Sequence, residues 1–304
     1  MTIRFDRPVS HAAHASRLIA AFALVLCVLV LLGHRFGPLA TPNLVLLLLI
    51  SAGVAAIAVF LAVVGLVQLW QIGAEGGVSA FKALVYAALP LALLVVGAER
   101  YVALPELYDV STDVGNAPQW LKPPHADQIW MTRKTDLTPE DRAAQSTAYP
   151  ALTGRRYEGA ADRVLEAVRQ VAKDSRITIT KVEGAADIEP DAPPPIPLPR
   201  GGNDAAVTDA PDLVPVPTPR PDEEDEVASL IRRNTDVTLQ GETRTRILGL
   251  RFDVLIRLHE EAETTLVDIR VASRYGPHDL GFSAAIAEAY LKALDAELLG
   301  IAGD

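Results

Sequence analysis

Six polar residues near the end of the chain lie within twelve positions and could form a binding site: Asp268, Arg270, Ser273, Arg274, His278 and Asp279. Residues two apart in a strand point to the same side, so Asp268, Arg270 and Arg274 should share one face. Arginine side chains bind carboxylates and phosphates through paired hydrogen bonds. These residues therefore form a candidate recess for an anionic ligand, such as a lipid headgroup or a carboxylate.

The same cluster also has a purely structural interpretation. Charged residues that alternate along a strand form ion pairs with neighbouring strands on a solvated face. Asp279 precedes the last predicted helix and is placed to cap its start. Arg244, Arg246 and Arg257 come from neighbouring predicted strands and could join either arrangement. The sequence leaves both interpretations open.

Motifs for other chemistry are missing from the sequence. It contains neither a GxxxxGK[ST] nor a GxGxxG phosphate loop, and no HExxH. No two histidines of the soluble part have metal-ligand spacing, and the single cysteine, Cys27, excludes a disulfide framework and a Cys-rich metal site. We therefore assign no catalytic residue, no metal and no cofactor, and we lean against an enzyme.

Charge is divided unevenly along the chain. Residues 1–100 hold six Lys and Arg against three Asp and Glu, whereas residues 101–304 hold 22 against 35. Because no basic patch is large enough to neutralise many phosphates, we expect no nucleic-acid partner. An apolar, slightly basic front third joined to an acidic remainder also rules out a single soluble globule.

Three apolar runs, residues 18–33, 44–67 and 83–98, predict helices that span a membrane. About 20 helical residues cross the hydrocarbon core, and the second run exceeds that length without a charge. The other two are shorter, but basic side chains at their ends can reach the headgroups. The alternative for the first run is a cleaved signal peptide, but the residues after it lack a small-x-small cleavage pattern.

Basic residues near the span ends predict the orientation. The N-terminal arm carries Arg4, Arg7 and Arg17, whereas the first connection carries only Arg35. Basic residues favour the cytoplasmic side of a membrane. We therefore predict a multi-pass protein of the bacterial inner (cytoplasmic) membrane, with a cytoplasmic N-terminus and a periplasmic domain from residue 101 onward.

Hydrophobic periodicity in the remainder predicts a small α+β domain, with an antiparallel sheet covered by helices. Residues 157–174 show one apolar helical face, and a last helix is expected over residues 281–299. Strand patterns occur over residues 177–182, 237–248, 251–259 and 264–274. In the last of these, Val267, Ile269 and Val271 should face the core, with Asp268, Arg270 and Arg274 facing away.

The domain, residues 157–304, is predicted to have an extended lead-in and an internal interruption. Residues 101–156 read as an extended lead-in with a short helix near residues 139–146. Eleven of the chain's 22 prolines lie in residues 190–221, and an acidic run follows. Because prolines and like charges cannot build a core, we predict that residues 186–226 are a disordered insertion. A docking site for a proline-binding partner is the alternative.

Residues 267–281 read Val-Asp-Ile-Arg-Val-Ala-Ser-Arg-Tyr-Gly-Pro-His-Asp-Leu-Gly, which resembles the signature of the domain-of-unknown-function 1499 family. The segments 111–113 (Ser-Thr-Asp), 117–118 (Ala-Pro) and 149–150 (Tyr-Pro) look like earlier motifs of that family. The three-span front end, near Trp70 and Gly73, is similar to its proteobacterial membrane members. The family has no established activity, so the resemblance implies location and domain boundaries, not a reaction.

The resemblance is incomplete at the start of the last helix. The family pattern continues there with an Asn and an Arg, whereas this chain has Ser283, Ala285 and Ile286. If those polar groups form part of a site in the family, this chain has lost part of it.

These observations favour a non-enzymatic binding or envelope-maintenance role. The lipid bilayer is one partner, and an anionic ligand, a lipid or an envelope protein is the expected second one. The alternatives are a membrane-anchored hydrolase or transferase using residues 270–279, and a structural subunit of a membrane complex. A deep pocket at Arg270, Arg274, His278 and Asp279 would favour the enzyme, and a flat charged face with apolar patches elsewhere would favour the subunit.

Overall fold

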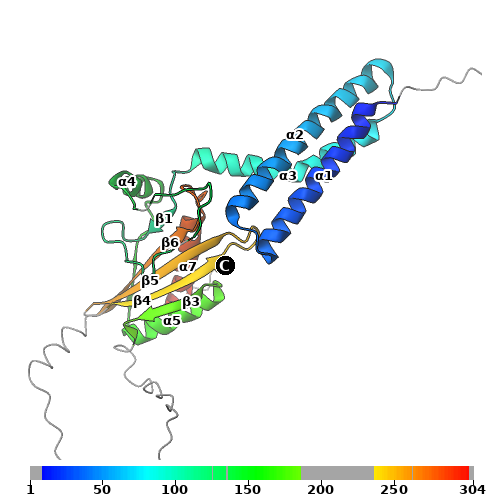
Figure 1. Ribbon diagram of the computed structural model, residues 1–304. Coiled ribbons are helices and arrows are strands. Elements are labelled where there is room, and N and C mark those ends of the chain that lie inside the picture. The colour runs from blue at the N-terminus through cyan, green and yellow to red at the C-terminus, as the bar shows by residue number, and fades with distance from the viewer. Residues whose placement is uncertain (1–8, 125, 135, 186–235, 262, 301–304) are drawn as a thin grey trace, which may run out of the picture.

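A computed structural model describes residues 9–124, 126–134, 136–185, 236–261 and 263–300 (Figure 1). It shows a bundle of three long helices and an α+β domain at one end of that bundle. The predicted insertion at residues 186–226, and Arg4 and Arg7 of the N-terminal arm, lie outside the described residues.

The bundle consists of α1 (His11–Phe36), α2 (Thr41–Ile72) and α3 (Gly77–Ala103), and each is long and apolar enough to span a membrane. This confirms the three predicted spans. The helices meet through nine fully buried alanines: Ala13, Ala20, Ala23, Ala55, Ala58, Ala62, Ala80, Ala83 and Ala87. Small residues let helices approach closely in lipid, whereas large side chains such as Phe22 and Phe60 point outward.

The start of α1 and the α+β domain lie at opposite ends of the bundle (Figure 1). At the first end, the Ser10 N–H donates to the Glu75 carbonyl oxygen at 2.9 Å, which ties the start of α1 to the α2–α3 connection. At the other end, the last turn of α1 and the end of α3 both contact the domain. The domain is therefore fixed to the bundle at two points.

The domain contains a six-stranded antiparallel sheet in the order β1-β6-β5-β4-β3, with β2 beside β1 on the same edge of β6. The strands are β1 (Asp109–Ser111), β2 (Arg155–Glu158), β3 (Thr178–Glu183), β4 (Val237–Arg244), β5 (Arg251–Glu260) and β6 (Thr264–Ser273). This confirms the predicted antiparallel sheet. The sequence analysis missed β1 and β2, and it placed the end of β4 too late because residues 245–250 form the turn into β5.

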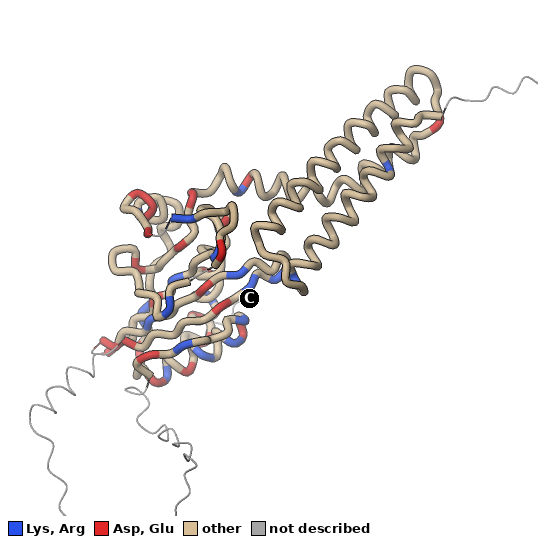
Figure 2. The backbone as a smooth tube through the Cα atoms, in the orientation of Figure 1, with Lys and Arg blue, Asp and Glu red and all other residues tan. Residues whose placement is uncertain are grey.

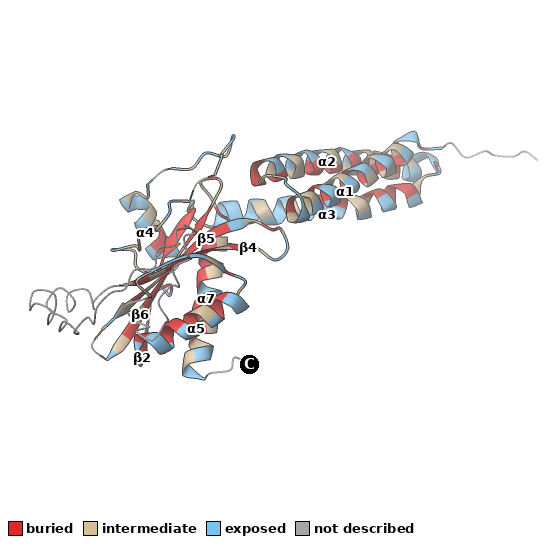
Figure 3. Ribbon diagram, turned by 60° about the horizontal axis from the view of Figure 1, so that its bottom comes forward, coloured by how far each residue is buried: buried red, intermediate tan, exposed pale blue. Residues whose placement is uncertain are grey.

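Two helices, α5 (Ala161–Asp174) and α7 (Phe282–Leu299), cover one face of the sheet and enclose the core (Figure 3). Val267, Ile269 and Val271 are fully buried in this core, as the alternation predicts. The Tyr290 hydroxyl at the centre of α7 donates to the Val168 carbonyl oxygen at 3.1 Å, which joins the two helices. Apolar burial on this face is the main stabilising contribution to the domain.

The opposite face of the sheet is covered by chain that the sequence analysis treated as a lead-in. Residues 112–124 and 126–134, called the strap below, bind side chains and backbone of β4, β5 and β6. The helix α4 (Pro139–Ala148) follows, close to the predicted position, and lies at the open edge of β1. Residues 107–158 are therefore an integral part of the domain, with Leu107, Val110, Leu152 and Tyr157 in its core.

Candidate functional site

Arg270 lies on the covered face of the sheet and is enclosed by strand and strap. Its Nε and Nη2 donate to the Asp109 carboxylate of β1 at 2.7–3.2 Å, and its Nη1 donates to the Pro118 carbonyl oxygen at 2.7 Å. The ring of Trp120 lies 5.0 Å from the guanidinium carbon. The Asp109 carboxylate, the Pro118 carbonyl oxygen and the Trp120 ring therefore surround this guanidinium.

Arg257 bridges two carboxylates on the same face. Its Nη2 donates to Asp268 at 2.7 Å and to Asp113 of the strap at 3.0 Å. Burial acts to lower the pKa of Arg257, but the hydrogen bond and charge of Asp268 outweigh it and raise the pKa. Asp268 is 2 % exposed and also accepts from the Thr112 hydroxyl at 3.0 Å, so both of its oxygens are occupied.

Arg274 forms the third group of ion pairs. It donates to both Asp253 oxygens at 2.7–2.9 Å, and its Nη2 lies 2.6 Å from Glu242. Chiefly through the hydrogen bonds to Asp253, the pKa of Arg274 is raised above its ordinary value. The Arg274 side chain is 14 % exposed and that of Asp253 only 6 %, so this pair is largely shielded from water.

These three arginines of the covered face are already paired with carboxylates of the protein. They are matched by five carboxylates: Asp109, Asp113, Glu242, Asp253 and Asp268. The sequence-based alternative of cross-strand ion pairs describes this arrangement correctly, but the face is covered by the strap and not solvated. An anion at these arginines would have to displace a carboxylate held by the protein.

The other three predicted residues lie at the turn into α7. The Ser273 hydroxyl donates to the Tyr275 carbonyl oxygen. His278 stacks on Tyr101 with ring centroids 4.8 Å apart; its Nδ1 accepts from the Leu280 N–H, which leaves Nε2 to donate to the Leu104 carbonyl oxygen. This turn therefore joins the end of α3 to the domain.

Asp279 fulfils its predicted role at the start of α7. Its two oxygens accept from the backbone N–H groups of Gly281 and Ser283 at 2.8 and 2.7 Å. Gly281 is the N-cap residue, so Asp279 acts from two positions before the cap. It satisfies two N–H groups that the first turn of the helix leaves without partners.

A hollow of about 540 Å³ opens beside Asp268, at the junction of strap, α4 and β2. Of the six predicted residues, only Asp268 lines it. The full lining is Thr112, Asp113, Val114, Gln145, Ser146, Tyr149, Pro150, Leu152, Thr153, Gly154, Arg156, Leu266 and Asp268. Segments 111–113 and 149–150, singled out in the sequence far from Asp268, thus meet it here. A Cβ atom at Gly154 would lie 2.6 Å from the Asp268 Oδ1, so glycine permits this close approach.

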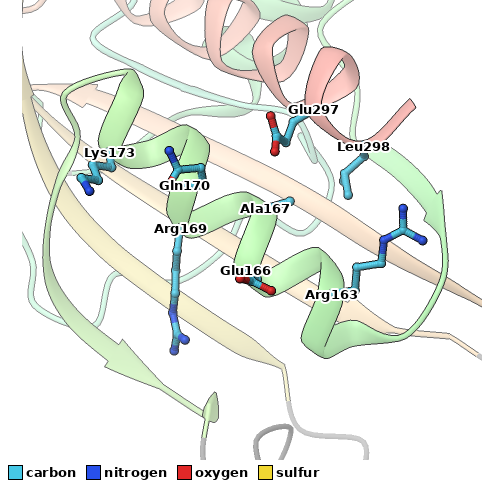
Figure 4. A pocket seen from close by; sticks show the side chains of 8 residues that line it. All are labelled: Arg163, Glu166, Ala167, Arg169, Gln170, Lys173, Glu297 and Leu298. Atoms are coloured by element: carbon cyan, nitrogen blue, oxygen red, sulfur yellow. The ribbon is translucent and has the colours of Figure 1, made fainter. Parts of the chain in front are cut away.

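A second hollow of about 460 Å³ lies between α5 and α7 on the outside of the domain (Figure 4). Its lining is mostly charged side chains of both signs: Arg163, Glu166, Arg169, Lys173 and Glu297, with Gln170, Ala167 and Leu298. Neither of these two hollows is lined by Arg270, Arg274, His278 or Asp279. Neither hollow is therefore the deep pocket at those residues that would favour a hydrolase or transferase.

The sequence analysis missed four residues that contact Arg270 or line the hollow, namely Asp109, Trp120, Gln145 and Arg156. Asp109 and Trp120 could not be found from periodicity, because they come from a three-residue strand and from irregular chain. No group of three or more His, Cys, Asp or Glu that could hold a metal occurs in the part of the chain that the structure describes.

Comparison with known proteins places the domain in a family. The searches of curated proteins and of solved structures gave no match. The model of the family DUF1499, described as a protein of unknown function, matches residues 131–294. That match starts near the end of the strap and ends within α7, and it covers more than half of the chain. The chain therefore belongs to the DUF1499 family.

Proposed function

We propose that this protein is a membrane-anchored binding protein without enzymatic activity, and that the hollow beside Asp268 takes a small polar ligand. In this proposal the chain spans a bacterial inner membrane three times. Its N-terminus lies in the cytoplasm and its domain in the periplasm, where ligand binding serves envelope maintenance.

The observation that carries the proposal is the convergence of distant segments on one hollow. Strap, α4, β2 and β6 each contribute side chains to it, including Thr112, Ser146, Arg156 and Asp268. Its volume of about 540 Å³ falls in the range of small-molecule sites. The arginine cluster next to it is neutralised internally, so it stiffens the wall of the hollow and does not itself bind the ligand.

The lining indicates the class of ligand. Hydroxyl groups of Thr112, Ser146 and Thr153 are combined with apolar Leu152, Leu266 and Pro150. Asp268 and Arg156, charged groups of opposite sign in the lining, are paired with Arg257 and Glu261, so neither offers an unpaired charge to an ion. These groups suit a neutral molecule with several hydroxyl groups, such as a sugar or a polyol, better than a phosphate or a carboxylate.

The test is thermal unfolding of the full chain in detergent with neutral sugars and myo-inositol, each compared with its phosphorylated form. A ligand at 100 times its Kd stabilises the folded state by about 2.7 kcal/mol, which raises the Tm measurably. We expect at least one neutral compound to raise the Tm more than its phosphate does.

A pair of neighbouring substitutions on α4 locates the binding. Ser146 lines the hollow and Thr147 does not, although both are exposed and each donates its hydroxyl to the carbonyl four residues earlier. Ser146→Phe should abolish the Tm rise, whereas Thr147→Phe should retain it. No shift with any neutral compound, or equal loss in both variants, would contradict the proposal.

A further inference from the structure

The turn between β4 and β5 lies against the end of the first membrane helix. The His34 Nδ1 donates to the Leu248 carbonyl oxygen at 2.7 Å, and its Nε2 lies 3.1 Å from the Thr41 hydroxyl. Arg35 packs so closely that a Cβ atom at Gly249 would lie 3.1 Å from the Arg35 Cδ. We call residues 244–251 together with Arg35 and Phe36 the tip.

The tip concentrates positive charge in a domain that is otherwise acidic. It contains four arginines, Arg35, Arg244, Arg246 and Arg251, and no Asp or Glu. Figure 2 shows basic residues gathered where the bundle meets the domain. None of the four belongs to an ion pair with the residues that the structure describes, in contrast to the three arginines under the strap.

Two of these arginines are neighbours on adjacent strands. Arg244 and Arg251 are direct cross-strand partners, at the pair that closes the β4–β5 hairpin. Like charges in this position destabilise a sheet. A bound anion removes that repulsion, so the pair is a second observation that points to a negatively charged ligand.

The tip also exposes large apolar side chains. Ile247 at the centre of the turn is 85 % exposed, and Phe36 at the end of α1 is 81 % exposed. The Arg35 guanidinium carbon lies 5.8 Å from the Phe36 ring. Exposed apolar groups among arginines are typical of a surface that enters the headgroup layer of a membrane.

The position of the tip along the bundle also corresponds to the headgroup layer. The apolar run of α1 ends at Gly33, and His34, which binds the turn, follows it directly. About 20 helical residues fill the hydrocarbon core, so helix beyond the apolar run lies among the headgroups. The hairpin is therefore held at the headgroup level by contacts within the protein itself.

From these observations we infer that the tip binds anionic phospholipid headgroups of the bilayer that α1, α2 and α3 span. Arg244, Arg246 and Arg251 contact the phosphates, and Ile247 enters the interface beside Phe36. The acidic remainder of the domain is repelled by the same surface. The lipid thus fixes the tilt of the domain against the membrane. This inference does not depend on the hollow beside Asp268.

Native mass spectrometry of the full chain, in micelles with equal amounts of phosphatidylglycerol and phosphatidylcholine, tests the inference. We expect the parent to retain phosphatidylglycerol preferentially. Each basic residue near an anionic surface contributes on the order of 1 kcal/mol, so Arg244→Gln with Arg251→Gln should reduce the preference roughly thirtyfold. The preference should also weaken at high salt, because the tip is exposed.

The matched control is Arg163→Gln with Lys173→Gln, which removes the same charge from the exposed surface of α5. It should leave the preference unchanged. In phosphatidylcholine alone, the Arg244 and Arg251 variant should be at least as stable as the parent, because a like-charge pair is removed. An equal loss of the phosphatidylglycerol preference in both double variants would overturn the inference. So would a parent protein that retains soluble glycerol phosphate as well as it retains phosphatidylglycerol.

Discussion

Arg257, Arg270 and Arg274 on the covered face of the sheet are each held by at least one buried carboxylate, and burial changes the effect of losing such an arginine. An exposed ion pair contributes under about 1 kcal/mol, because water and salt screen it. Removing one partner of a buried pair leaves the other charge without compensation, which destabilises the fold by about 3–5 kcal/mol. Because the strap covers these ion pairs, the larger loss of stability, that of a buried pair, applies to them.

Arg274→Ala should accordingly destabilise the protein by about 3 kcal/mol or more, because it leaves Asp253 buried and unpaired. Lys134→Ala is the control: Lys134 also forms an ion pair, with Asp141, but its side chain is 53 % exposed. The control should lower the free energy of unfolding by less than about 1 kcal/mol. Urea unfolding of the full chain in detergent measures both. A loss for Arg274→Ala as small as the control would show that the face is solvated.

Two isoleucines give a similar contrast on apolar burial. Ile269 is fully buried in the core, and Ile247 is 85 % exposed at the tip. Ile269→Ala should destabilise the fold by about 2–5 kcal/mol through lost burial and a cavity. Ile247→Ala should change the free energy of unfolding by no more than about 0.5 kcal/mol in the same urea experiment. Similar losses in the two variants would mean that the assigned strand faces are wrong.

For single residues, the sequence predicts well which face of the sheet a side chain occupies, but it predicts poorly which residues surround that side chain. Alternation alone shows that Ile269 and Arg270 point to opposite faces, because the strand period is a local property of the backbone. It cannot show that Asp109 and Trp120, about 150 positions away, enclose Arg270. The predicted facing of the β6 side chains is therefore confirmed, whereas the partners of the arginines depend on tertiary contacts.

Among the elements, β1 depends on a side chain in place of a further strand. The Gln145 amide of α4 donates to the Ser111 carbonyl oxygen at 2.6 Å and accepts from the Ser111 N–H at 3.3 Å. These are the two bonds that a neighbouring strand would make. A capping box of Thr138 and Asp141 starts α4 and holds Gln145 in place.

Gln145→Ala should lower the free energy of unfolding by about 1–3 kcal/mol, because buried backbone groups of Ser111 lose their partners. Ser146→Ala, one position along the same helix and exposed, should change it by less than about 0.5 kcal/mol. Hydrogen exchange should show faster exchange at Ser111 in the first variant only. Unchanged protection there would mean that α4 does not secure the edge of the sheet.

The elements that the sequence revealed are those long enough to show a period. The strands β5 and β6 have ten residues each, and α7 has 18, so their patterns repeat several times. By contrast, β1 and β2 have three and four residues and show no repeat. Both are defined by pairing with β6, which is a property of the assembled sheet and not of the segments themselves.

For the chain as a whole, the predicted insertion can be tested through its ends. Glu183 pairs with Thr238 in the β3–β4 hairpin, and a Cβ atom at Gly184 would lie 2.5 Å from the Asp236 carbonyl oxygen. The described residues that flank the predicted insertion are therefore close together, held by pairing between β3 and β4. A shorter loop costs slightly less closure entropy, since this cost varies slowly with length.

Replacing residues 190–226 by a short Gly-Ser linker should leave the domain folded, with cooperative unfolding and a Tm equal to or slightly above that of the parent. Limited proteolysis of the parent should cut first within residues 190–226, and the shortened chain should resist the same treatment. Loss of cooperative unfolding in the shortened chain would show that the segment packs on the core.

Topology across the membrane follows from the bundle and from the charges at its two ends. The start of α1 and the α2–α3 connection lie at one end, and the α+β domain lies at the other. If the bundle spans a membrane, either orientation therefore places the start of α1 and the domain on opposite sides of it. Arg4, Arg7 and Arg17 favour the cytoplasm for the N-terminal side, although the arginines of the tip lie at the domain end.

Alkaline phosphatase, which is active only outside the cytoplasm, should be active when fused after Leu104 or after Asp304 and inactive when fused after Gly73. A fluorescent protein that matures only in the cytoplasm should give the opposite pattern at the same three positions. The fusion after Gly73 serves as the control, since it lies at the end of the bundle away from the domain. The fully inverted pattern would place the domain in the cytoplasm and refute the predicted orientation. It would leave the lipid contact of the tip intact, because that contact depends on the end of α1 and not on which leaflet surrounds it.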